Sequence, residues 1–270
     1  MILNELPVIE MFNMDLTEYQ MNALTKQNSR KCDEFRAEKF QKESQKHWDL
    51  FYKRNETRFF KDRHWTTREF KELAADNQSK VLFEIGCGVG NFLYPLLEEQ
   101  DDKLFIYAAD ISPKAIEFVQ KNPKYDQEKI YAFTCDVSIP RCFDEKIEDN
   151  KVDIASMIFV LSAIRPILFK IVLQNIHKVL KPNGLLIFRD YAINDMAMFR
   201  FKQGTKINDR HYLRQDGTTT YFFTLEEMKV LVESVGFVME MNELIERRTV
   251  NKKENVDVPR IFLQGKYRKI

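Results

Sequence analysis

A strand, a glycine-rich turn and a helix follow one another near residue 85, and this order limits the folds open to the chain. Residues 81–83 (VLF) predict a buried strand, and residues 84–90 (EIGCGVG) predict a turn at its carboxyl end. Residues 91–100 then predict a helix. In this arrangement the N–H groups at the helix N-terminus point outward, so a ligand can bind against bare backbone.

The spacing of the glycines indicates the class of ligand. A dinucleotide fingerprint, G-x-G-x-x-G, would place its third glycine at position 91, but that residue is Asn91. The run E-x-G-x-G-x-G at 84–90 instead resembles the turn of class I S-adenosylmethionine (SAM) methyltransferases. Because glycines also gather in ordinary tight turns, this motif needs support from the rest of the chain.

Acidic residues after two further strands provide that support. Asp110 follows a predicted strand at 104–109 and lies twenty residues after Gly90, the separation at which an acid reaches ribose hydroxyls. Asp136 follows a strand at 129–134, where SAM enzymes commonly bind the adenine amino group. Ligands of open α/β sheets lie outside the carboxyl ends of the strands, so these features together predict SAM binding.

Alternating strands and helices fill the rest of the chain. Further strands are predicted at 152–160, 185–188, 237–245 and 258–268, with helices at 113–120, 166–180 and 225–235. Such alternation predicts a parallel sheet covered on both faces. We therefore expect an α/β fold of the class I SAM-dependent methyltransferase type. Its Rossmann-like, seven-stranded, mostly parallel sheet would occupy a core of residues 76–270, behind an N-terminal helical extension of residues 1–75.

The composition of the chain argues against several classes of protein. The apolar runs are shorter than the ~20 residues that a membrane span requires. The N-terminal residues carry acids and no Arg, which argues against a signal or transit peptide. Cys32, Cys87, Cys135 and Cys142 show no C-x-x-C spacing, so we expect a reduced chain without a metal site. We predict a cytoplasmic protein, with a nuclear fraction left open, that acts as a monomer and binds no membrane.

The net charge of +1 hides three basic segments. Residues 26–71 hold 14 Lys and Arg against 8 Asp and Glu, residues 189–215 hold 6 against 3, and residues 246–270 hold 8 against 3. If these segments meet on one face, that face suits a phosphate backbone. For any one segment alone, the ordinary alternative of solvated surface charge is the better interpretation.

The arm of residues 1–75 is expected to begin with a poorly fixed lead-in up to about residue 20. No Pro or Gly interrupts residues 26–52, and apolar residues recur there at helical spacing, which predicts one charged helix. Trp48 and Tyr52 are four residues apart and share a face of that helix. Both rings can cap the adenosine pocket or simply dock the arm on the core, and periodicity alone favours docking.

Cations alternate with aromatic residues in the next segment, NETRFFKDRHWTTREF (55–70). Rings that stack on unpaired bases and cations that meet phosphates are the expected chemistry of single-stranded RNA recognition. The alternative, in which the rings pack inward and the cations are solvated, is equally consistent with this segment alone. Thr66 and Glu69 also predict a helix start before the core.

Two motifs that the sequence lacks narrow the choice of methyl-acceptor atom. The strand at 152–160 ends in IFVL, without the (N/D)-P-P-(Y/F) element of exocyclic-amine methyltransferases. No cysteine follows that strand or the strand at 185–188, which disfavours a covalent mechanism at pyrimidine C5. Direct transfer to an atom that is already nucleophilic remains, with the protein supplying position and charge.

Several longer runs resemble the tRNA N3-methylcytidine methyltransferases of the methyltransferase-like family, and most closely the cytosolic branch acting on serine tRNAs. The runs are WDLFYKRN (48–55), FFKDRHWTTREF (59–70), EIGCGVGN (84–91), IFVLSA (158–163), FRDY (188–191), LRQDGTTTYFF (213–223), TVNKKE (249–254) and VPRIFLQ (258–264). The resemblance covers the chain from about residue 30 to its end. It implies a SAM-dependent enzyme that forms N3-methylcytidine in the tRNA anticodon loop, with serine tRNA as the expected substrate.

The resemblance also implies roles for individual residues. The implied SAM contacts are Trp48, Tyr52, Gly86, Asp110, Asp136, Val137 and Ile158, to which the glycine turn adds Gly88. This reverses the preference for docking at Trp48 and Tyr52. The insertion 191–223 is expected to form a basic wall over the substrate, with a hairpin tip at 215–218. The residues expected to contact RNA are Arg54, Phe60, Lys61, Arg63, His64, Arg68, Arg189, Tyr191, Arg200, Lys202 and Arg214.

The chemistry of cytosine N3 suggests a catalytic residue. Its lone pair lies in the ring plane and carries no proton at neutral pH, so no strong base is needed, but the base must be unpaired or flipped. Methyl transfer makes the ring cationic, and a carboxylate that accepts from the exocyclic amine would stabilise this charge. We predict this role for Asp190, after the strand at 185–188; a structural pair with Arg189 or a helix end is the alternative.

Two rival functions stay open from the sequence: a methyltransferase acting on a protein or small molecule, and a non-catalytic subunit that keeps the fold. The intact glycine turn, Asp110 and Asp136 argue against the second. A small basic patch supplies affinity but little sequence reading. Because of this, and from the family resemblance, seryl-tRNA synthetase is a candidate partner that presents the tRNA.

Overall fold

The computed structural model describes residues 16–75, 78–100, 103–251 and 256–270. Most of the predicted N-terminal lead-in and part of the run at 249–254 therefore lie outside the described residues. So do residues 76–77, where the predicted boundary between arm and core falls. No helix of the described residues combines the length and apolar character that a membrane span requires.

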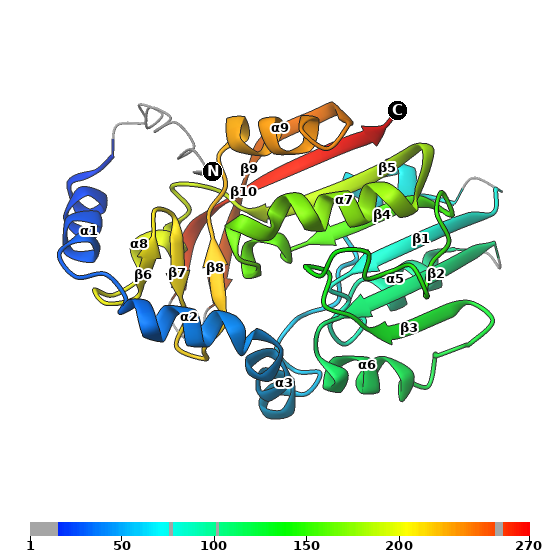
Figure 1. Ribbon diagram of the computed structural model, residues 1–270, viewed down its shortest axis with the longest axis horizontal. Helices are drawn as coiled ribbons and strands as arrows, with labels where there is room; N and C mark the ends of the chain where they lie inside the picture. The colour runs from blue at the N-terminus through cyan, green and yellow to red at the C-terminus, as the bar shows by residue number, and fades with distance from the viewer. Residues whose placement is uncertain (1–15, 76–77, 101–102, 252–255) are drawn as a thin grey trace.

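A seven-stranded sheet forms the centre of the molecule, in the order β3-β2-β1-β4-β5-β10-β9 (Figure 1). The strands are β1 (Lys80–Ile85), β2 (Leu104–Asp110), β3 (Ile130–Thr134), β4 (Val152–Ile158), β5 (Leu180–Tyr191), β9 (Phe237–Asn251) and β10 (Val256–Lys269). Strands β1 to β5 pair in parallel, whereas β10 is antiparallel to both β5 and β9. The predicted mostly parallel α/β sheet is confirmed, with a longer final hairpin than expected.

Helices cover both faces of this sheet. They are α5 (Leu93–Glu99) and α6 (Pro113–Gln120) on one face, and α7 (Phe169–Val179) and α9 (Leu225–Glu233) on the other (Figure 1). Neighbouring residues of a strand point to opposite faces. Thus Leu82 packs with α5 and α6, while Phe83 packs with the α7 and α9 cluster. Burial on both faces explains why residues 81–83 of β1 are a continuous apolar run.

Local capping explains where two of these helices begin. The Ser112 hydroxyl accepts from the Ala115 N–H at the start of α6, next to Pro113 in the first turn. Thr224 accepts from the Glu227 N–H at the start of α9. The Glu227 side chain binds Arg210 and Tyr221 instead of returning to the cap, so only half of a capping box forms.

The arm contains three helices where the sequence predicts one: α1 (Glu18–Asn28), α2 (Glu34–Lys42) and α3 (Ser44–Asn55). The first break lies between α1 and α2. It ends at Asp33, whose carboxylate accepts from the Arg36 N–H and caps the start of α2. The second break is at Glu43, where the chain leaves helical geometry before α3. The predicted start at Thr66 gives only one turn, α4 (Thr66–Glu69), followed by a 3₁₀ turn, η1 (Lys71–Leu73).

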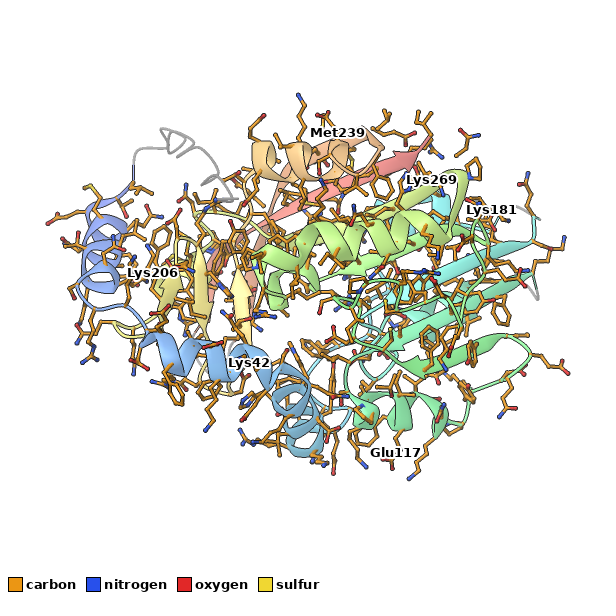
Figure 2. All side chains as sticks on the ribbon, in the orientation of Figure 1. Lys42, Glu117, Lys181, Lys206, Met239 and Lys269 are labelled. Carbon is orange, nitrogen blue, oxygen red and sulfur yellow. The ribbon has the colours of Figure 1, made fainter. Side chains whose placement is uncertain are left out.

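The insertion 191–223 folds into α8 (Met196–Phe199) and a small sheet of β6 (Lys206–Asn208), β7 (His211–Leu213) and β8 (Thr219–Tyr221). The predicted hairpin at 215–218 joins β7 to β8. Much of the predicted basic wall is buried, however, including His211 and Lys206. Lys206 lies between the insertion and α1 (Figure 2), and its ammonium group donates to the Asn28 side chain of α1. Buried Gln27 of α1 completes this attachment by donating to the carbonyls of Met198 and Phe201.

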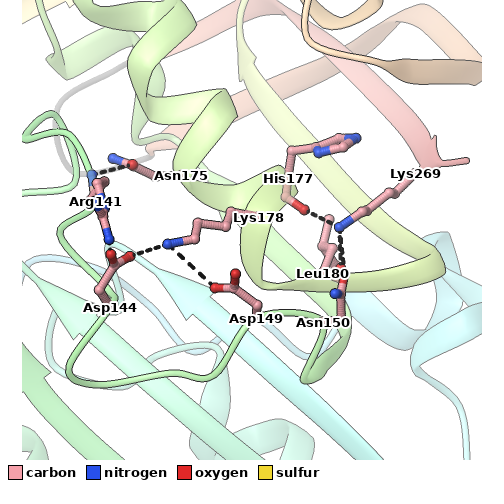
Figure 3. Close-up of polar contacts among 9 residues, drawn as sticks. All are labelled: Arg141, Asp144, Asp149, Asn150, Asn175, His177, Lys178, Leu180 and Lys269. Atoms are coloured by element: carbon pink, nitrogen blue, oxygen red, sulfur yellow. Dashed lines mark hydrogen bonds and ion pairs between the residues drawn. The ribbon is translucent and has the colours of Figure 1, made fainter.

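The loop after β3 is anchored by α7, as Figure 3 shows. The Asn175 side chain accepts from the Arg141 N–H at 2.9 Å and donates to the Val137 carbonyl at 3.0 Å. Lys178 adds ion pairs to Asp144 and Asp149. This loop carries Asp136, so α7 fixes one end of the site described next.

Candidate functional site

A cavity lies outside the carboxyl ends of β1 to β4 and contains about 840 Å³ of empty space, part of it open to solvent. The structure brings all eight predicted cofactor residues together in its lining: Trp48, Tyr52, Gly86, Gly88, Asp110, Asp136, Val137 and Ile158. The lining comes from three strand ends, the glycine turn and α3 of the arm.

The glycine turn has a shape that other residues would not adopt freely. Gly86 and Gly88 have φ of 67° and 55°, in the left-handed region. A Cβ at Gly88 would lie 2.9 Å from the Tyr52 hydroxyl, and one at Gly86 would collide with Val160. The turn therefore leaves a backbone-lined space against which a ligand can lie closely.

The two predicted acids are held in the cavity by backbone groups. Asp110 is buried and accepts from the N–H groups of Gly88 and Ser112, each at 2.9 Å. Burial raises the pKa of Asp110 to about 6, against the opposing effect of these hydrogen bonds. Asp136 binds both polar groups of Ser138 through Oδ1. Its Oδ2 has no partner in the part of the chain that the structure describes, so it is available to a ligand's amino group.

Helix α3 both docks the arm and lines the cavity. Asp49 accepts from the Ser112 hydroxyl and the Lys114 N–H, each at 3.0 Å, and Phe51 packs near Val89. Trp48 and Tyr52 lie on the cavity side, with ring centroids 6.1 Å apart. The two interpretations of these rings are thus compatible. Asp49 was missed from the sequence, because an acid within a charged helix carries no sign of the distant N-terminus it binds.

Ten of the eleven predicted RNA residues fall into three groups. Phe60 and Arg63 line the cavity itself, whereas Tyr191 and Arg214 are half-buried beside it. Six are exposed: Arg54, Lys61, His64 and Arg68 on the arm, and Arg200 and Lys202 on the insertion.

Arg189 is a correction to the expected set of RNA contacts. It is 3% exposed, forms an ion pair with Glu69, and its cation lies 3.9 Å from the centre of the Trp65 ring. Gln264 also accepts from the same guanidinium. A cation held this way ties the segment at 65–69 to β5 and cannot meet an RNA phosphate at the surface.

Three rings form a cluster around Phe159, which follows β4 and lines the cavity. The Phe159 ring centroid lies 5.1 Å from that of Tyr191 and 5.2 Å from that of Phe262. Phe159 has a left-handed φ of 60°, and its N–H donates to the Arg189 carbonyl at 2.7 Å. Arg214 lies over the Tyr191 ring at 5.5 Å. Strained backbone of this kind is often found at functional sites, and these aromatic faces suit stacking of a nucleobase.

Asp190 lies beneath these rings and does not line the cavity. Its side chain is fully buried, and its two oxygens accept from the N–H groups of Ser162 and Tyr191, each at 2.9 Å. Burial raises the pKa of Asp190 to about 6. In this conformation a base cannot touch the carboxylate, so the direct contact expected from the sequence is not formed here.

Comparisons with known proteins address the identity of the chain. A family model described as a methyltransferase domain matches residues 52–241. The chain is 50% identical over 240 residues to the tRNA N(3)-cytidine methyltransferase METTL6 of Homo sapiens, covering 87% of this chain and 84% of that protein. This chain belongs to the tRNA N3-cytidine methyltransferases. It is also 41% identical over 245 residues to the tRNA N(3)-methylcytidine methyltransferase trm141 of Schizosaccharomyces pombe, covering 89% of this chain and 98% of that protein.

Solved structures support the fold assigned to this methyltransferase. A SAM-dependent methyltransferase from Anabaena variabilis superposes with a TM-score of 0.62 at 13% identity, covering 83% of this chain and 94% of that chain. Another, from Methanosarcina mazei, has a TM-score of 0.55 at 17% identity, covering 72% of this chain and 94% of that chain. These likenesses show the fold, and together with the family match they make the enzyme a class I, SAM-dependent methyltransferase.

The cavity of this methyltransferase fits SAM on its own features. The glycine turn leaves room that a Cβ would fill. Buried Glu84 lines the cavity, and its Oε2 atom has no hydrogen-bond partner among the residues that the structure describes. An unsatisfied buried carboxylate oxygen is costly unless a ligand supplies a donor. No cluster of three or more potential metal ligands occurs among the described residues.

Proposed function

We propose that this enzyme methylates N3 of a cytidine in the anticodon loop of tRNA, with serine tRNA as its substrate. The observation that carries the proposal is a cluster of three rings, in which Phe159 lines the cofactor cavity and packs against Tyr191 and Phe262. The relatives whose names specify tRNA N3-cytidine support the same acceptor atom.

The residues proposed to hold SAM contact different parts of the cofactor. Asp110 binds the ribose hydroxyls, and Oδ2 of Asp136 accepts from the adenine amino group, while Trp48 and Tyr52 cover the adenosine from the arm. When bound, SAM supplies an electrophilic methyl group on a sulfonium. Gly86, Gly88, Val137 and Ile158 complete the pocket by shape.

The acceptor residues orient a base that needs no deprotonation. We place the flipped cytosine against Tyr191, with Arg214 near its flanking phosphate. Asp190 then acts through position: it holds the backbone of Ser162 and Tyr191, and its buried charge favours the cationic product ring. Asp190→Ala should lower kcat by roughly 10²-fold or more, as removal of a preorganised electrostatic group does, while SAM affinity stays unchanged. A fully active variant would remove Asp190 from the mechanism.

The exposed cations are proposed to bind the tRNA backbone. They lie on the arm of residues 1–75, which is also proposed to cap SAM, and on the insertion 191–223 of the core. Hydrogen bonds between α1 of the arm and the insertion hold these two parts together. Contacts to phosphates position an RNA without reading its sequence, and they weaken as salt rises. We therefore propose that seryl-tRNA synthetase presents the serine tRNA to a monomeric, cytoplasmic catalyst.

The proposed function is tested by incubating the protein with labelled SAM and total tRNA, with and without seryl-tRNA synthetase, and digesting the RNA to nucleosides. Label in N3-methylcytidine, increased by the synthetase and restricted to serine tRNA, is expected. Label only in protein would indicate a protein methyltransferase. Label in other tRNAs, with no effect of the synthetase, would contradict the proposed substrate and partner.

A further inference from the structure

A second cavity lies beside the cofactor cavity, and the two share part of their lining. The second cavity contains about 760 Å³ of empty space, part of it open to solvent. The residues that line both cavities are Ser44, Ile111, Asp136, Ala163 and Ile164. The remaining lining of the second cavity comes from α2, the loop after β3, the segment at 165–168 and the β7–β8 hairpin. The two spaces therefore adjoin along a common wall.

Asp136 belongs to this common wall, and only one of its oxygens is occupied. Oδ1 accepts from the N–H and the hydroxyl of Ser138, at 2.9 and 2.6 Å, and Ser138 lines only the second cavity. Oδ2 has no partner in the described parts of the chain and is proposed to bind the adenine amino group. An adenine bound in this way has its amino group at the boundary between the two cavities.

A contact between the arm and the insertion closes one side of the second cavity. The rings of Phe40 and His47 are stacked, with centroids 4.7 Å apart. Gly217 of the hairpin packs closely on both rings: a Cβ there would lie 2.8 Å from Cε1 of Phe40 and would collide with His47. In β8, the Thr219 hydroxyl donates to the Ala163 carbonyl at 3.2 Å. The shape of the second cavity is therefore set by packing between the arm, the insertion and the core.

The chemistry of the adenine amino group permits a substituent at this boundary. The amino group carries two N–H donors, and a single bond to Oδ2 of Asp136 uses only one of them. A group that replaces the other hydrogen atom leaves that bond intact. It would meet apolar surface in the second cavity, which is lined by Phe40, Ile111, Ala163, Ile164 and Leu168 together with polar side chains. An aromatic ring gains from contact with such surface.

We propose that the second cavity is a subsite for substituents on N6 of the cofactor adenine, and that it takes aryl and alkyl groups. The remaining N–H of a substituted amino group donates to Asp136, while the substituent packs against Phe40 and Leu168. The inference rests on the proposed function, because it requires the adenine of SAM at Asp136. It assigns to α2 and the β7–β8 hairpin a role in selecting the cofactor.

The first test compares three ligands of the unmodified protein by calorimetry: S-adenosylhomocysteine, its N6-benzyl derivative, which keeps one N–H on the amino group, and its N6-benzyl-N6-methyl derivative, which keeps none. We expect the N6-benzyl compound to bind within about 5-fold of S-adenosylhomocysteine. The N6-benzyl-N6-methyl compound should bind about 10-fold more weakly than the N6-benzyl compound, because Asp136 loses its donor.

The second test fills the subsite from the arm. Gln41 lines only the second cavity, so Gln41→Trp should occupy that space without entering the cofactor cavity. Gln45→Trp is the matched control, because Gln45 is exposed and lines neither cavity. We expect Gln41→Trp to weaken the N6-benzyl compound by about 10-fold or more, since two large groups would compete for one space. Its affinity for S-adenosylhomocysteine should be unchanged, and Gln45→Trp should alter neither.

Three results would overturn the inference. The first is an N6-benzyl compound that binds the unmodified protein more than about 5-fold more weakly than S-adenosylhomocysteine. The second is tight binding of that compound that Gln41→Trp does not weaken, because the benzyl group would then lie in solvent. The third is equal affinity for the N6-benzyl and N6-benzyl-N6-methyl compounds, which would exclude the bond to Asp136.

A photoaffinity ligand decides if Gln41→Trp does not fold. Irradiation of the unmodified protein with N6-(4-azidobenzyl)-S-adenosylhomocysteine should label peptides that contain residues 40–44 or 163–168, which line the second cavity. Label confined to other peptides would overturn the inference. Failure of the unmodified protein to bind S-adenosylhomocysteine would overturn the proposed function as well, so the two failures are distinguishable.

Discussion

Gly86→Ala tests the geometry of the glycine turn through both stability and cofactor binding. At a φ of 67° an alanine would have to adopt the left-handed conformation, which destabilises the folded state by about 1–2 kcal/mol. The new methyl group would also lie 3.1 Å from Cγ1 and 3.3 Å from Cβ of Val160, with Cγ2 closer still. Rotation of the valine cannot clear all three atoms, and overpacking of this kind costs about 1–3 kcal/mol. The free energy of unfolding should therefore fall by about 2–5 kcal/mol.

Urea titration measures this loss, and calorimetry measures S-adenosylhomocysteine affinity, which should fall because Val160 is displaced in the cavity wall. Gly236→Ala is the matched control: its φ is 101°, but the nearest atom to a new Cβ is 3.3 Å away and lies outside the cavity. In a Val160→Ala background, Gly86→Ala should lose the collisions with Cγ1 and Cγ2 and retain mainly the backbone cost, because only the contact with Cβ at 3.3 Å remains. If Gly86→Ala loses no more stability than Gly236→Ala and binds the ligand normally, the steric argument is refuted.

Three further predictions concern buried or cavity-lining groups. Arg189→Met should lower the free energy of unfolding by about 3 kcal/mol, because it leaves Glu69 without its buried partner; a loss in urea titration no larger than that of the exposed Arg58→Met would contradict the pairing. Burial raises the pKa of Glu84 to about 8 in the folded protein, so the folded state favours the protonated carboxyl group. This contribution to the free energy of unfolding is complete below the ordinary pKa of a glutamate and is lost as pH rises through 8. Between pH 6 and 8 the free energy of unfolding without ligand should fall by up to about 1.4 kcal/mol per unit in the unmodified protein, and identical profiles for Glu84→Gln would exclude this. Trp48→Ala should weaken S-adenosylhomocysteine about 10-fold or more, as loss of an aromatic anchor does, and unchanged affinity would assign Trp48 to docking alone.

The sheet and the cofactor acids could be predicted from sequence because their signals are local. Apolar runs define the strands, glycines define the turn after β1, and Asp110 and Asp136 follow their strands directly in the chain. The carboxyl ends of parallel strands meet at one edge. It could therefore be predicted that residues far apart in the sequence lie close together, without knowledge of any individual contact.

The errors concern hydrogen bonds and ion pairs that the periodicity of the sequence does not record. Arg189 was assigned to RNA, yet it pairs with Glu69, which is 120 residues earlier. Asp190 was expected at the base, yet the N–H groups of Ser162 and Tyr191 occupy its oxygens in the core. The arm was expected to be one helix because apolar periodicity does not record where Asp33 caps a new one. Local patterns give residue types, whereas burial and pairing are decided by packing between elements.

The central claim is that a cytosine lies against the rings beside the cofactor cavity and is methylated at N3. It is tested most directly with two serine tRNA transcripts that differ only by uridine in place of the anticodon-loop cytidine, each incubated with SAM and seryl-tRNA synthetase. Fragment mass spectrometry locates the added methyl group. The account predicts one N3-methylcytidine at that loop position in the first transcript and no methylation of the second. Methylation of the second transcript, or of a cytidine outside the anticodon loop in the first, would contradict it.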